Sequence, residues 1–271
     1  IKIIRADGNT HRFVSTVNHR LVFRLIFVVL RNGNDTVAHE IMNNYLAEAD
    51  AYDIAGLYQL YHGSVCLKGA FKNLYDVPNV NFEHIWWNSS FTEELTYDGK
   101  LFYAIGDMNL SVTSTLMGVF FNQNKFIDYY EDPSVLYDLV RKGKWTRDTF
   151  EEYLSGTYQD LNGNGTKEMD DFVGFILDEA DIGPWLPAFN IRLCTKDDSG
   201  TPQLSYYNEK SVDAHYWMYD LFLEHPDVYF APKNSGYIDA FKNDKALFAI
   251  IKFDDAATIL RDMESTYGVV P

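Results

Sequence analysis

Cysteine is scarce in this chain, and its two copies, Cys66 and Cys194, lie far apart in 271 residues. Neither has the CxxC or Cys/His spacing of a zinc site, and two cysteines do not make a small disulfide-stapled domain. The longest apolar run, residues 21–30, is interrupted by Arg24 and is too short to span a bilayer. No signal peptide or lipobox is visible, and both ends have the pattern of a strand. We therefore expect the chain to be incomplete at both termini.

Basic residues are also few, with 23 Lys and Arg against 39 Asp and Glu, which gives a net charge of −16. Such a field repels phosphate backbones and anionic membrane surfaces, so nucleic acid is not expected as a partner. Apolar residues make up 46% of the chain, enough for a buried core, and aromatic residues make up 16%. Rings beyond the needs of the core are suited to stacking on the C–H faces of a sugar.

Catalytic motifs are missing as well. The chain contains no HExxH, GxSxG, P-loop or GxGxxG sequence. The carboxylate pairs Glu93/Glu94 and Asp254/Asp255 are neighbours in sequence, so their side chains point apart and do not oppose each other across a glycosidic bond. We expect no enzymatic activity. A glycoside hydrolase, and a surface glycan-binding protein that works without an importer, remain the alternatives.

Hydrophobic periodicity predicts alternating strands and helices, which is typical of an α/β fold with mostly parallel sheets flanked by helices. The predicted strands are residues 1–5, 22–30, 51–56, 101–105, 119–122, 173–177 and 246–251. The predicted helices are residues 11–20, 37–46, 65–76, 132–141, 146–154, 211–223 and 256–267. No flexible linker marks a boundary. We place a first lobe at residues 1–118, a second at 119–268, and the start of a crossing back to the first at 269–271.

One segment, residues 160–171, follows the calcium-loop spacing D-x-[DN]-x-[DN]-G. Gly165 permits the sharp turn, and alternating hard oxygen donors are what a large hard cation requires. The predicted ligands of a structural calcium ion are Asp160, Asn162, Asn164, Thr166 through its carbonyl, Glu168 and Asp171. The twelfth position is Asp171 where a calcium loop has Glu, and an Asn- and Gly-rich turn without metal remains the alternative.

Several stretches, in this order, resemble one family. They are Ala49-Asp50-Ala51-Tyr52-Asp53-Ile54, Trp86-Trp87, Gly143-Lys144-Trp145-Thr146, the Asp160 loop followed by Phe172-Val173-Gly174-Phe175, and Tyr267-Gly268-Val269-Val270-Pro271. Over residues 35–271 the chain is similar to the extracellular solute-binding proteins of bacterial ABC sugar importers, especially the lipoprotein forms of gut Firmicutes. The compressed first 25 residues and the lack of helices after the final proline depart from that family.

The resemblance implies a two-lobed, type II periplasmic-binding-protein-like fold that captures a carbohydrate, an oligosaccharide, by hinge closure. It also implies an extracellular monomer held by an N-terminal lipid and read by an ABC permease. Ligands of such sheets bind beyond the carboxyl ends of strands. The candidate ligand-binding residues are Tyr58, Trp87, Asp107, Asn109, Thr115, Trp185, Phe253 and Asp254. Core packing remains the alternative for Trp87, Trp185 and Phe253, and it is the expected role of Trp86 and Trp145.

Overall fold

The computed structural model describes residues 2–5, 10–12, 25–29, 35–49, 54–56 and 59–271. The chain divides into two compact units, residues 1–107 and 108–271, and each is considered by itself below. The boundary that the sequence suggested, after residue 118, falls later in the chain, inside the first strand of the second unit. Tyr58 lies outside the described residues.

The first unit contains a four-stranded sheet in the order β2-β1-β3-β4, with β1, β3 and β4 parallel and β2 antiparallel to β1. Its strands are β1 (Lys2–Arg5), β2 (Thr10–Arg12), β3 (Leu25–Val29) and β4 (Ile54–Gly56). Its helices are α1 (Asp35–Leu46), α2 (Gln59–Leu67), the single turn η1 (Leu74–Asp76) and α3 (Ser89–Leu95). Ala38, Ile41 and Met42 recur at helical spacing on α1 and pack against Val65 of α2.

Three expectations for this unit need correction. Residues 101–105 form no strand; isolated bridges join Trp87 to Gly106 and Tyr97 to Lys100 instead. The helix predicted over 65–76 ends at Leu67, and Gly69 follows with a left-handed φ of 78°, a conformation that terminates helices. Residues 10–12 are strand β2 where a helix from residue 11 was expected, and residues 13–20 of that prediction lie outside the described part.

The second unit is built on a five-stranded mixed sheet in the order β11-β5-β10-β6-β9. Its strands, with the separate hairpin β7–β8, are β5 (Met117–Asn122), β6 (Val173–Asp178), β7 (Cys194–Lys196), β8 (Pro202–Leu204), β9 (Val228–Ala231), β10 (Ala246–Lys252) and β11 (Tyr267–Val270). The three strands β10, β6 and β9 are parallel, and β5 runs antiparallel to both β10 and β11. The unbroken apolar runs of β6 and β10 follow from burial on both faces.

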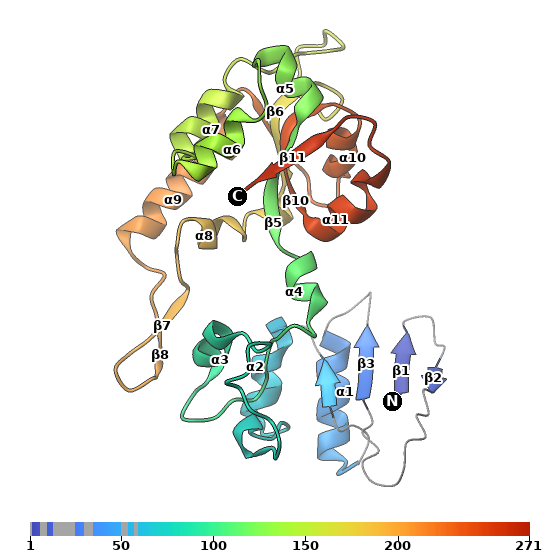
Figure 1. The fold of residues 1–271 in the computed structure, drawn as a ribbon, viewed down its shortest axis with the longest axis vertical. Helices are drawn as coiled ribbons and strands as arrows, with labels where there is room; N and C mark the ends of the chain where they lie inside the picture. Colours follow the sequence, from blue (N-terminus) through green and yellow to red (C-terminus); the bar gives the residue numbers. More distant parts are fainter. Residues whose placement is uncertain (1, 6–9, 13–24, 30–34, 50–53, 57–58) are drawn as a thin grey trace. The chain divides into compact units, whose positions relative to one another are not determined.

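Helices cover both faces of this sheet, as Figure 1 shows with α6, α7 and α9 on one side and α10 and α11 on the other. The helices are α4 (Leu110–Ser114), α5 (Gln123–Tyr129), α6 (Val135–Arg141), α7 (Arg147–Leu154), α8 (Trp185–Ala188), α9 (Glu209–Tyr219), α10 (Tyr237–Lys242) and α11 (Phe253–Thr258). Short turns are η2 (Glu179–Asp181), η3 (Asp220–Glu224) and η4 (Leu260–Asp262). Alternate residues of one strand serve alternate faces: Phe121 packs with Phe248 under α7, and Phe120 packs on the α10 side.

Most predicted elements of this unit are confirmed: β5, β6, β10, α6, α7 and α9 all cover the expected segments. The helix predicted over residues 256–267 is wrong in extent. Helix begins earlier, at Phe253, ends at Thr258, and the segment from Tyr267 is strand β11. The expected packing of Trp145 is confirmed, with its ring against Phe150 at 5.7 Å and its Nε1 donating to the Pro271 carbonyl at 2.9 Å.

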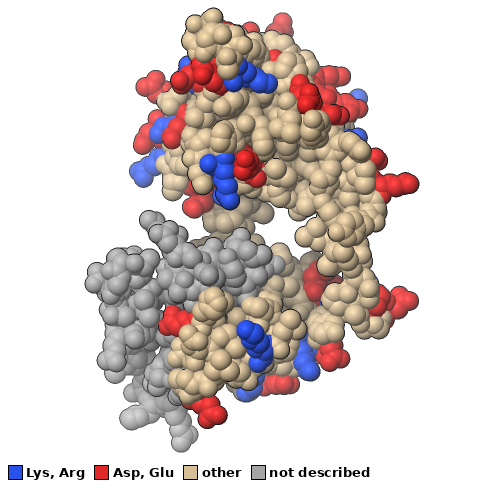
Figure 2. Space-filling model, turned by 180° about the vertical axis from the view of Figure 1, so that it is seen from behind, with Lys and Arg blue, Asp and Glu red and all other residues tan. Residues whose placement is uncertain are grey.

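Acidic side chains are spread over the described surface that Figure 2 presents, with Lys and Arg side chains distributed singly or in small groups among them. The cations of the second unit that form ion pairs include Lys125, Arg141 and Lys142, each within 4.0 Å of an aspartate three or four residues away. Exposed pairs of this kind contribute little to stability. They do lower the positive potential that these cations present to solvent.

Candidate functional site

The site begins with the geometry of the second sheet. Because β10, β6 and β9 are parallel, their carboxyl ends lie along one edge, at Lys252, Asp178 and Ala231. Since β5 is antiparallel to β10, its first residue, Met117, pairs with Lys252 at that same edge. We call this line of strand ends the sheet edge. It is the side of an α/β sheet on which ligands bind.

Three sequence-predicted residues meet at the sheet edge. Thr115 precedes β5, and Phe253 and Asp254 follow β10. The backbone N–H of Phe253 donates to the carbonyl of Leu116 at 3.0 Å, which joins the two segments directly. The structure therefore brings together residues that are more than a hundred positions apart in sequence.

The ring and the carboxylate at the sheet edge are both accessible. Phe253 is 41% exposed, and the part of its ring that is covered lies edge-on to Phe120, with centroids 5.9 Å apart. Asp254 is exposed in the first turn of α11. Thr115 is exposed too, and its hydroxyl donates to the Ser111 carbonyl at 2.6 Å, which leaves the oxygen's lone pairs as acceptors. The group can stack on an apolar face and accept hydrogen bonds from hydroxyls.

Behind the exposed group lies a buried polar cluster that sequence reasoning only partly found. Asp178 ends β6, and its Oδ1 accepts from the Ala180 N–H at 2.6 Å. Its backbone N–H donates to Asp181, whose pKa is raised by burial. Tyr237 donates its hydroxyl proton to the Ile250 carbonyl at 2.7 Å, and burial raises its pKa strongly as well. Asp178 directly follows the strand predicted over residues 173–177, whereas Asp181 and Tyr237 were missed, because nothing local in their sequence marks them.

This buried cluster holds the sheet edge in place. Asp178 Oδ2 also accepts from the backbone N–H of Asn234, so one carboxylate caps the turn after β6 and restrains the loop after β9. A buried carboxylate that accepts several backbone N–H groups is fully engaged. Asp178 is thus a structural cap, and the ligand-accessible oxygens of the edge belong to Asp254.

Trp185 lies in α8, directly after the turn that follows β6. Its ring packs against Phe175, Trp217 and Phe222, with centroids 5.5–6.1 Å apart, in the main core cluster. Its Nε1 is buried and has no hydrogen-bond partner among the described residues. These contacts are those of a packing residue. Its predicted ligand role therefore has no support in the contacts of its ring.

In the first unit, Trp87 and Asp107 are neighbours. Trp87 pairs with Gly106 in an isolated bridge, and the Asp107 N–H donates to the Trp86 carbonyl at 2.9 Å. A Cβ at Gly106 would lie 2.4 Å from that carbonyl oxygen, so only glycine permits the approach. Trp87 is half-buried against the ring of Phe82 at 5.0 Å, and Asp107 is exposed. Their adjacency was not visible in the sequence.

Two further residues from the sequence analysis, Trp86 and Asn109, lie outside the pairs described above. Trp86 is 48% exposed and stacks on His84 at 4.1 Å, so the expectation that it packs in the core is wrong. The preceding Ile85 is 95% exposed, which shows that this short loop presents its apolar side chains outward. Asn109 is the N-cap residue of α4 but makes no side-chain cap hydrogen bond there.

The calcium-type loop precedes β6, at the end opposite to the sheet edge. Asp160 accepts the backbone N–H groups of Gly163 at 2.7 Å and Gly165 at 2.8 Å. The backbone hydrogen bond from Gly165, ahead of the other causes, lowers the pKa of Asp160. Glu168 Oε1 accepts from the amide nitrogens of Asn162 and, at 2.8 Å, Asn164. Three of the six predicted ligands, Asn162, Asn164 and Glu168, are therefore in contact, and Asp160 binds the backbone of the same loop.

Asp171 behaves differently from the other predicted ligands. It is buried, and its carboxylate accepts the backbone N–H groups of Leu161 at 3.0 Å and Glu168 at 3.1 Å and the hydroxyl of Tyr158 at 3.2 Å. It closes the loop by joining its first and last turns. Within the described residues no three His, Cys, Asp or Glu side chains form a metal-binding group, and the loop's own donor set depends on two asparagines.

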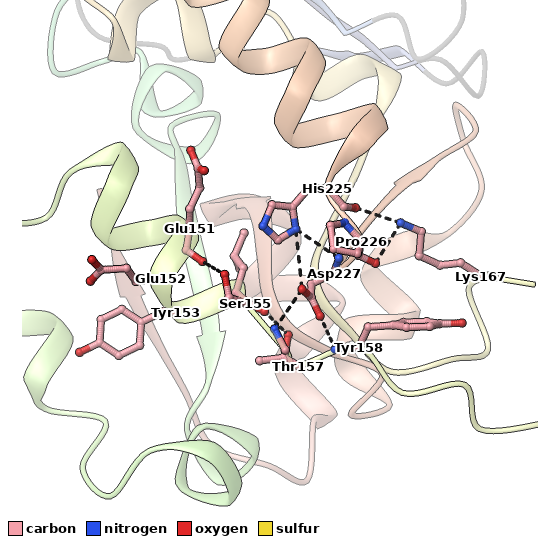
Figure 3. Close-up of polar contacts among 12 residues, drawn as sticks. Glu151, Glu152, Tyr153, Ser155, Thr157, Tyr158, Lys167, His225, Pro226 and Asp227 are labelled. Atoms are coloured by element: carbon pink, nitrogen blue, oxygen red, sulfur yellow. Dashed lines mark hydrogen bonds and ion pairs between the residues drawn. The ribbon is translucent and has the colours of Figure 1, made fainter.

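Another buried carboxylate, Asp227, anchors the segment that leads into the loop, as Figure 3 shows. Its Oδ2 and Oδ1 accept the N–H groups of Gly156 at 3.0 Å and Tyr158 at 2.6 Å. Lys167, from within the loop, donates to the carbonyls of His225 and Pro226, both at 3.1 Å. Burial lowers the pKa of Lys167. These contacts fix the loop to the segment that leads into β9.

The comparisons with known proteins bear on the fold. No protein-family model matches the chain, and no curated protein matches it. The maltose/maltodextrin-binding domain MalE from Bdellovibrio bacteriovorus, solved with maltotriose, matches with a TM-score of 0.58 at 15% identity, over 90% of this chain and 57% of that one. The extracellular solute-binding protein from Staphylococcus aureus, solved with maltose, has a TM-score of 0.57 at 16% identity, over 90% and 57% of the two chains.

UspC of M. tuberculosis gives a similar result, with a TM-score of 0.57 at 14% identity over 90% of this chain and 59% of that one. Over the part that it covers, the chain shares the α/β fold of these solved structures. The predicted fold class is confirmed. The chain spans less than two thirds of the length of each of these structures. Among the described residues, no helix is both long and apolar enough to cross a membrane.

Proposed function

We propose that the protein is the substrate-binding component of an ABC importer and captures a carbohydrate, an oligosaccharide, between its two lobes. The observation that carries the proposal is the sheet edge of the second unit, where Phe253 is 41% exposed beside the exposed carboxylate of Asp254. A ring next to hydrogen-bond acceptors is the arrangement that a sugar requires. The fold, shared with structures solved with maltose and maltotriose, supports the same class of ligand.

Each residue at the sheet edge has a distinct part in this proposal. The Phe253 ring stacks on the C–H face of one sugar residue, and Asp254 accepts hydrogen bonds from its hydroxyls. Thr115 offers an acceptor from the strand that pairs with β10. In the first unit, Trp87 and Asp107 offer a second ring and carboxylate, and Tyr58 keeps its predicted role. Asn109, at the start of the second unit, offers a side-chain amide. Trp185 packs in the core instead.

Capture then works by population shift. A ligand that contacts both lobes only when they are closed favours the closed form by its difference in affinity between the two states. We propose binding without turnover, since the candidate residues stack and hydrogen-bond. The proposal includes an extracellular monomer of the Firmicutes lipoprotein type, held by an N-terminal lipid, whose closed form is recognised by a membrane permease.

We also propose that the loop of residues 160–171 binds a structural calcium ion. Hard oxygen donors on alternating residues fit such an ion. Asn162, Asn164 and Glu168 are already in contact, and Asp160 accepts from the backbone of the same loop. The carbonyl of Thr166 would be the fifth donor. Asp171 is the weakest of the predicted ligands, because both of its oxygens already accept hydrogen bonds that close the loop.

A ligand screen tests the proposed function. The protein is titrated by thermal shift with neutral mono- and oligosaccharides, including maltotriose, and with di- and tripeptides and polyamines as competing classes. A ligand at a hundred times its Kd stabilises the folded state by about 2.7 kcal/mol. That corresponds to a rise in Tm of several degrees for a protein of this size. We expect such a rise with at least one oligosaccharide, and a smaller radius of gyration by X-ray scattering in its presence.

Two results would contradict the proposal. One is a response to peptides or polyamines with none to any sugar, which would change the class of ligand. The other is release of product from chromogenic glycosides, with turnover abolished by a carboxylate substitution. That result would make the protein a glycoside hydrolase.

A further inference from the structure

The second unit has an open groove, well apart in sequence from the residues of the sheet edge. It has a volume of about 640 Å³, within the range of small-molecule sites. It is formed by α9, by residues 206–208, which lead into it, and by Asp220, which follows it. The lining residues that matter below are Tyr206, Tyr207, Val212, Tyr216, Tyr219 and Asp220. We call this surface the α9 groove.

Two of its four tyrosine rings are held by hydrogen bonds. His215 Nδ1 lies 2.6 Å from the Ser211 carbonyl, which can only accept, so Nδ1 carries the proton. His215 Nε2 is then the acceptor for the Tyr206 hydroxyl at 2.7 Å. Tyr219 hydrogen-bonds to the Glu224 carboxylate, which raises the pKa of the phenol. These two rings are therefore oriented before any ligand arrives.

The other two rings are open to solvent. Tyr207 is 85% exposed and Tyr216 is 67% exposed, and neither hydroxyl has a hydrogen-bond partner among the described residues. Val212, one turn before Tyr216 on the same face of α9, is 53% exposed. Large apolar side chains gathered in one groove are unusual on a soluble surface and mark a binding site. The face of α9 that packs against the core carries Ala214 and Met218, so the groove residues are not needed there.

The side chains that line the groove limit the class of ligand that can bind there. Four phenol rings and one carboxylate, Asp220, line the groove, and aliphatic side chains are represented by Val212. A hydrophobic protein segment is matched better by aliphatic and methionine side chains than by phenols with free hydroxyls. Asp220 and Glu224 repel an anionic ligand. Rings that stack and hydroxyls that donate and accept match a neutral sugar, which has an apolar face and a hydroxyl rim.

We propose that the α9 groove is a second carbohydrate-binding surface, which takes a neutral glycan chain on Tyr207 and Tyr216. It extends the ligand class of the proposed function to a separate surface and uses no residue of the sheet edge. A weak second contact with a long glycan raises the local concentration of its chain ends near the protein without any change at the first site. The groove then favours polymers and long oligosaccharides over short ones.

Affinity electrophoresis tests this inference. The protein is run through native gels that contain amylopectin, xylan, mannan or no polysaccharide. We expect the unchanged protein to be retarded in at least one gel. The double substitution Tyr207→Ala with Tyr216→Ala should weaken the apparent affinity about tenfold or more, because both stacking faces are lost. Tyr97→Ala, at a 50% exposed tyrosine of the first unit, is the matched control and should migrate like the unchanged protein.

The outcomes separate this inference from the proposed function. The double variant should lose retardation and keep calorimetric binding of a short oligosaccharide unchanged, whereas Phe253→Ala should lose the binding of the short oligosaccharide. Equal retardation of the double variant and the unchanged protein would overturn the inference, as would no retardation in any gel. A dimer in sedimentation that the double variant abolishes, without retardation, would show that a second copy of the chain occupies the groove. Stabilisation by tetramethylammonium alone would show a cation site instead.

Discussion

The two ends of strand β6 can be compared directly, because one short strand joins them. At its start lies the loop of residues 160–171, whose oxygens accept hydrogen bonds from the loop's own N–H groups. At its other end lies the sheet edge, where Phe253 and Asp254 are exposed and make few contacts of their own. Groups whose hydrogen bonds are already made hold structure, and groups left accessible are available to a ligand. The loop at the start of β6 therefore stabilises the fold, and the sheet edge at its other end is available for ligand binding.

The largest expected effect is at the loop end. Asp227→Ala removes the acceptor for two backbone N–H groups, those of Gly156 and Tyr158. Each unsatisfied buried donor costs about 1–3 kcal/mol, so the free energy of unfolding should fall by about 2–5 kcal/mol in urea denaturation. Asp262→Ala, at an exposed position, should change it by less than about 0.5 kcal/mol. Equal stability of the two variants would remove the basis for calling the loop end structural.

Calcium should act at the same end with a somewhat smaller effect. At a hundred times its Kd, calcium would stabilise the protein by about 2.7 kcal/mol and raise Tm by several degrees. Asp160→Ala should abolish that rise, because it removes the first ligand of the loop, and Asp262→Ala should preserve it. An unchanged Tm with millimolar calcium would show that the loop is an Asn- and Gly-rich turn without metal.

At the sheet edge, Asp254→Asn should change binding and not folding. A hydrogen bond to a charged acceptor contributes about 1.5–3 kcal/mol, so the affinity for the oligosaccharide found in the screen should fall about tenfold or more. The melting temperature without ligand should stay the same, since the carboxylate is exposed. Asp262→Asn is the matched control. A Kd that does not move would take Asp254 out of the site.

The smallest expected effect is the dependence of the loop's stability on pH. Hydrogen bonds from the backbone of Gly165 and its neighbours lower the pKa of Asp160 below the 3.8 of a free aspartate. The unfolded chain therefore binds the proton first as pH falls. The contribution of Asp160 is fully present above about pH 4 and is lost as pH falls through the folded pKa. The protection factor of the Gly165 amide against hydrogen exchange, relative to an unfolded amide at the same pH, should fall only below that point. A loss of protection near neutral pH would contradict this.

Part of the loop and part of the sheet edge could be predicted from the sequence. Asp160 to Asp171 follow one another in the chain, so a spacing pattern found them. The strand-end rule pointed to Phe253 and Asp254, because the end of the buried strand over residues 246–251 can be inferred from its apolar run. Both predictions depend on local patterns or on one general property of parallel sheets.

What the sequence could not show depends on contacts between distant segments. Asp227 accepts from residues about seventy positions earlier, and its own surroundings, His225 and Pro226, carry no motif. From the sequence, the rings of Trp185 and Phe253 were equally good candidates for ligand binding. They differ in the structure, because Phe175, Trp217 and Phe222 pack around the ring of Trp185. Trp86 was expected in the core and is exposed, because an apolar residue in a short loop gives no periodicity from which burial can be judged.

The central claim is that the exposed ring at the sheet edge binds a sugar. Calorimetric titration of Phe253→Ala beside the unchanged protein, with the tightest oligosaccharide from the screen, tests it most directly. Loss of the stacking face should weaken binding about tenfold or more, with Tm in the absence of ligand unchanged. An affinity equal to that of the unchanged protein would contradict the claim and would place the sugar elsewhere.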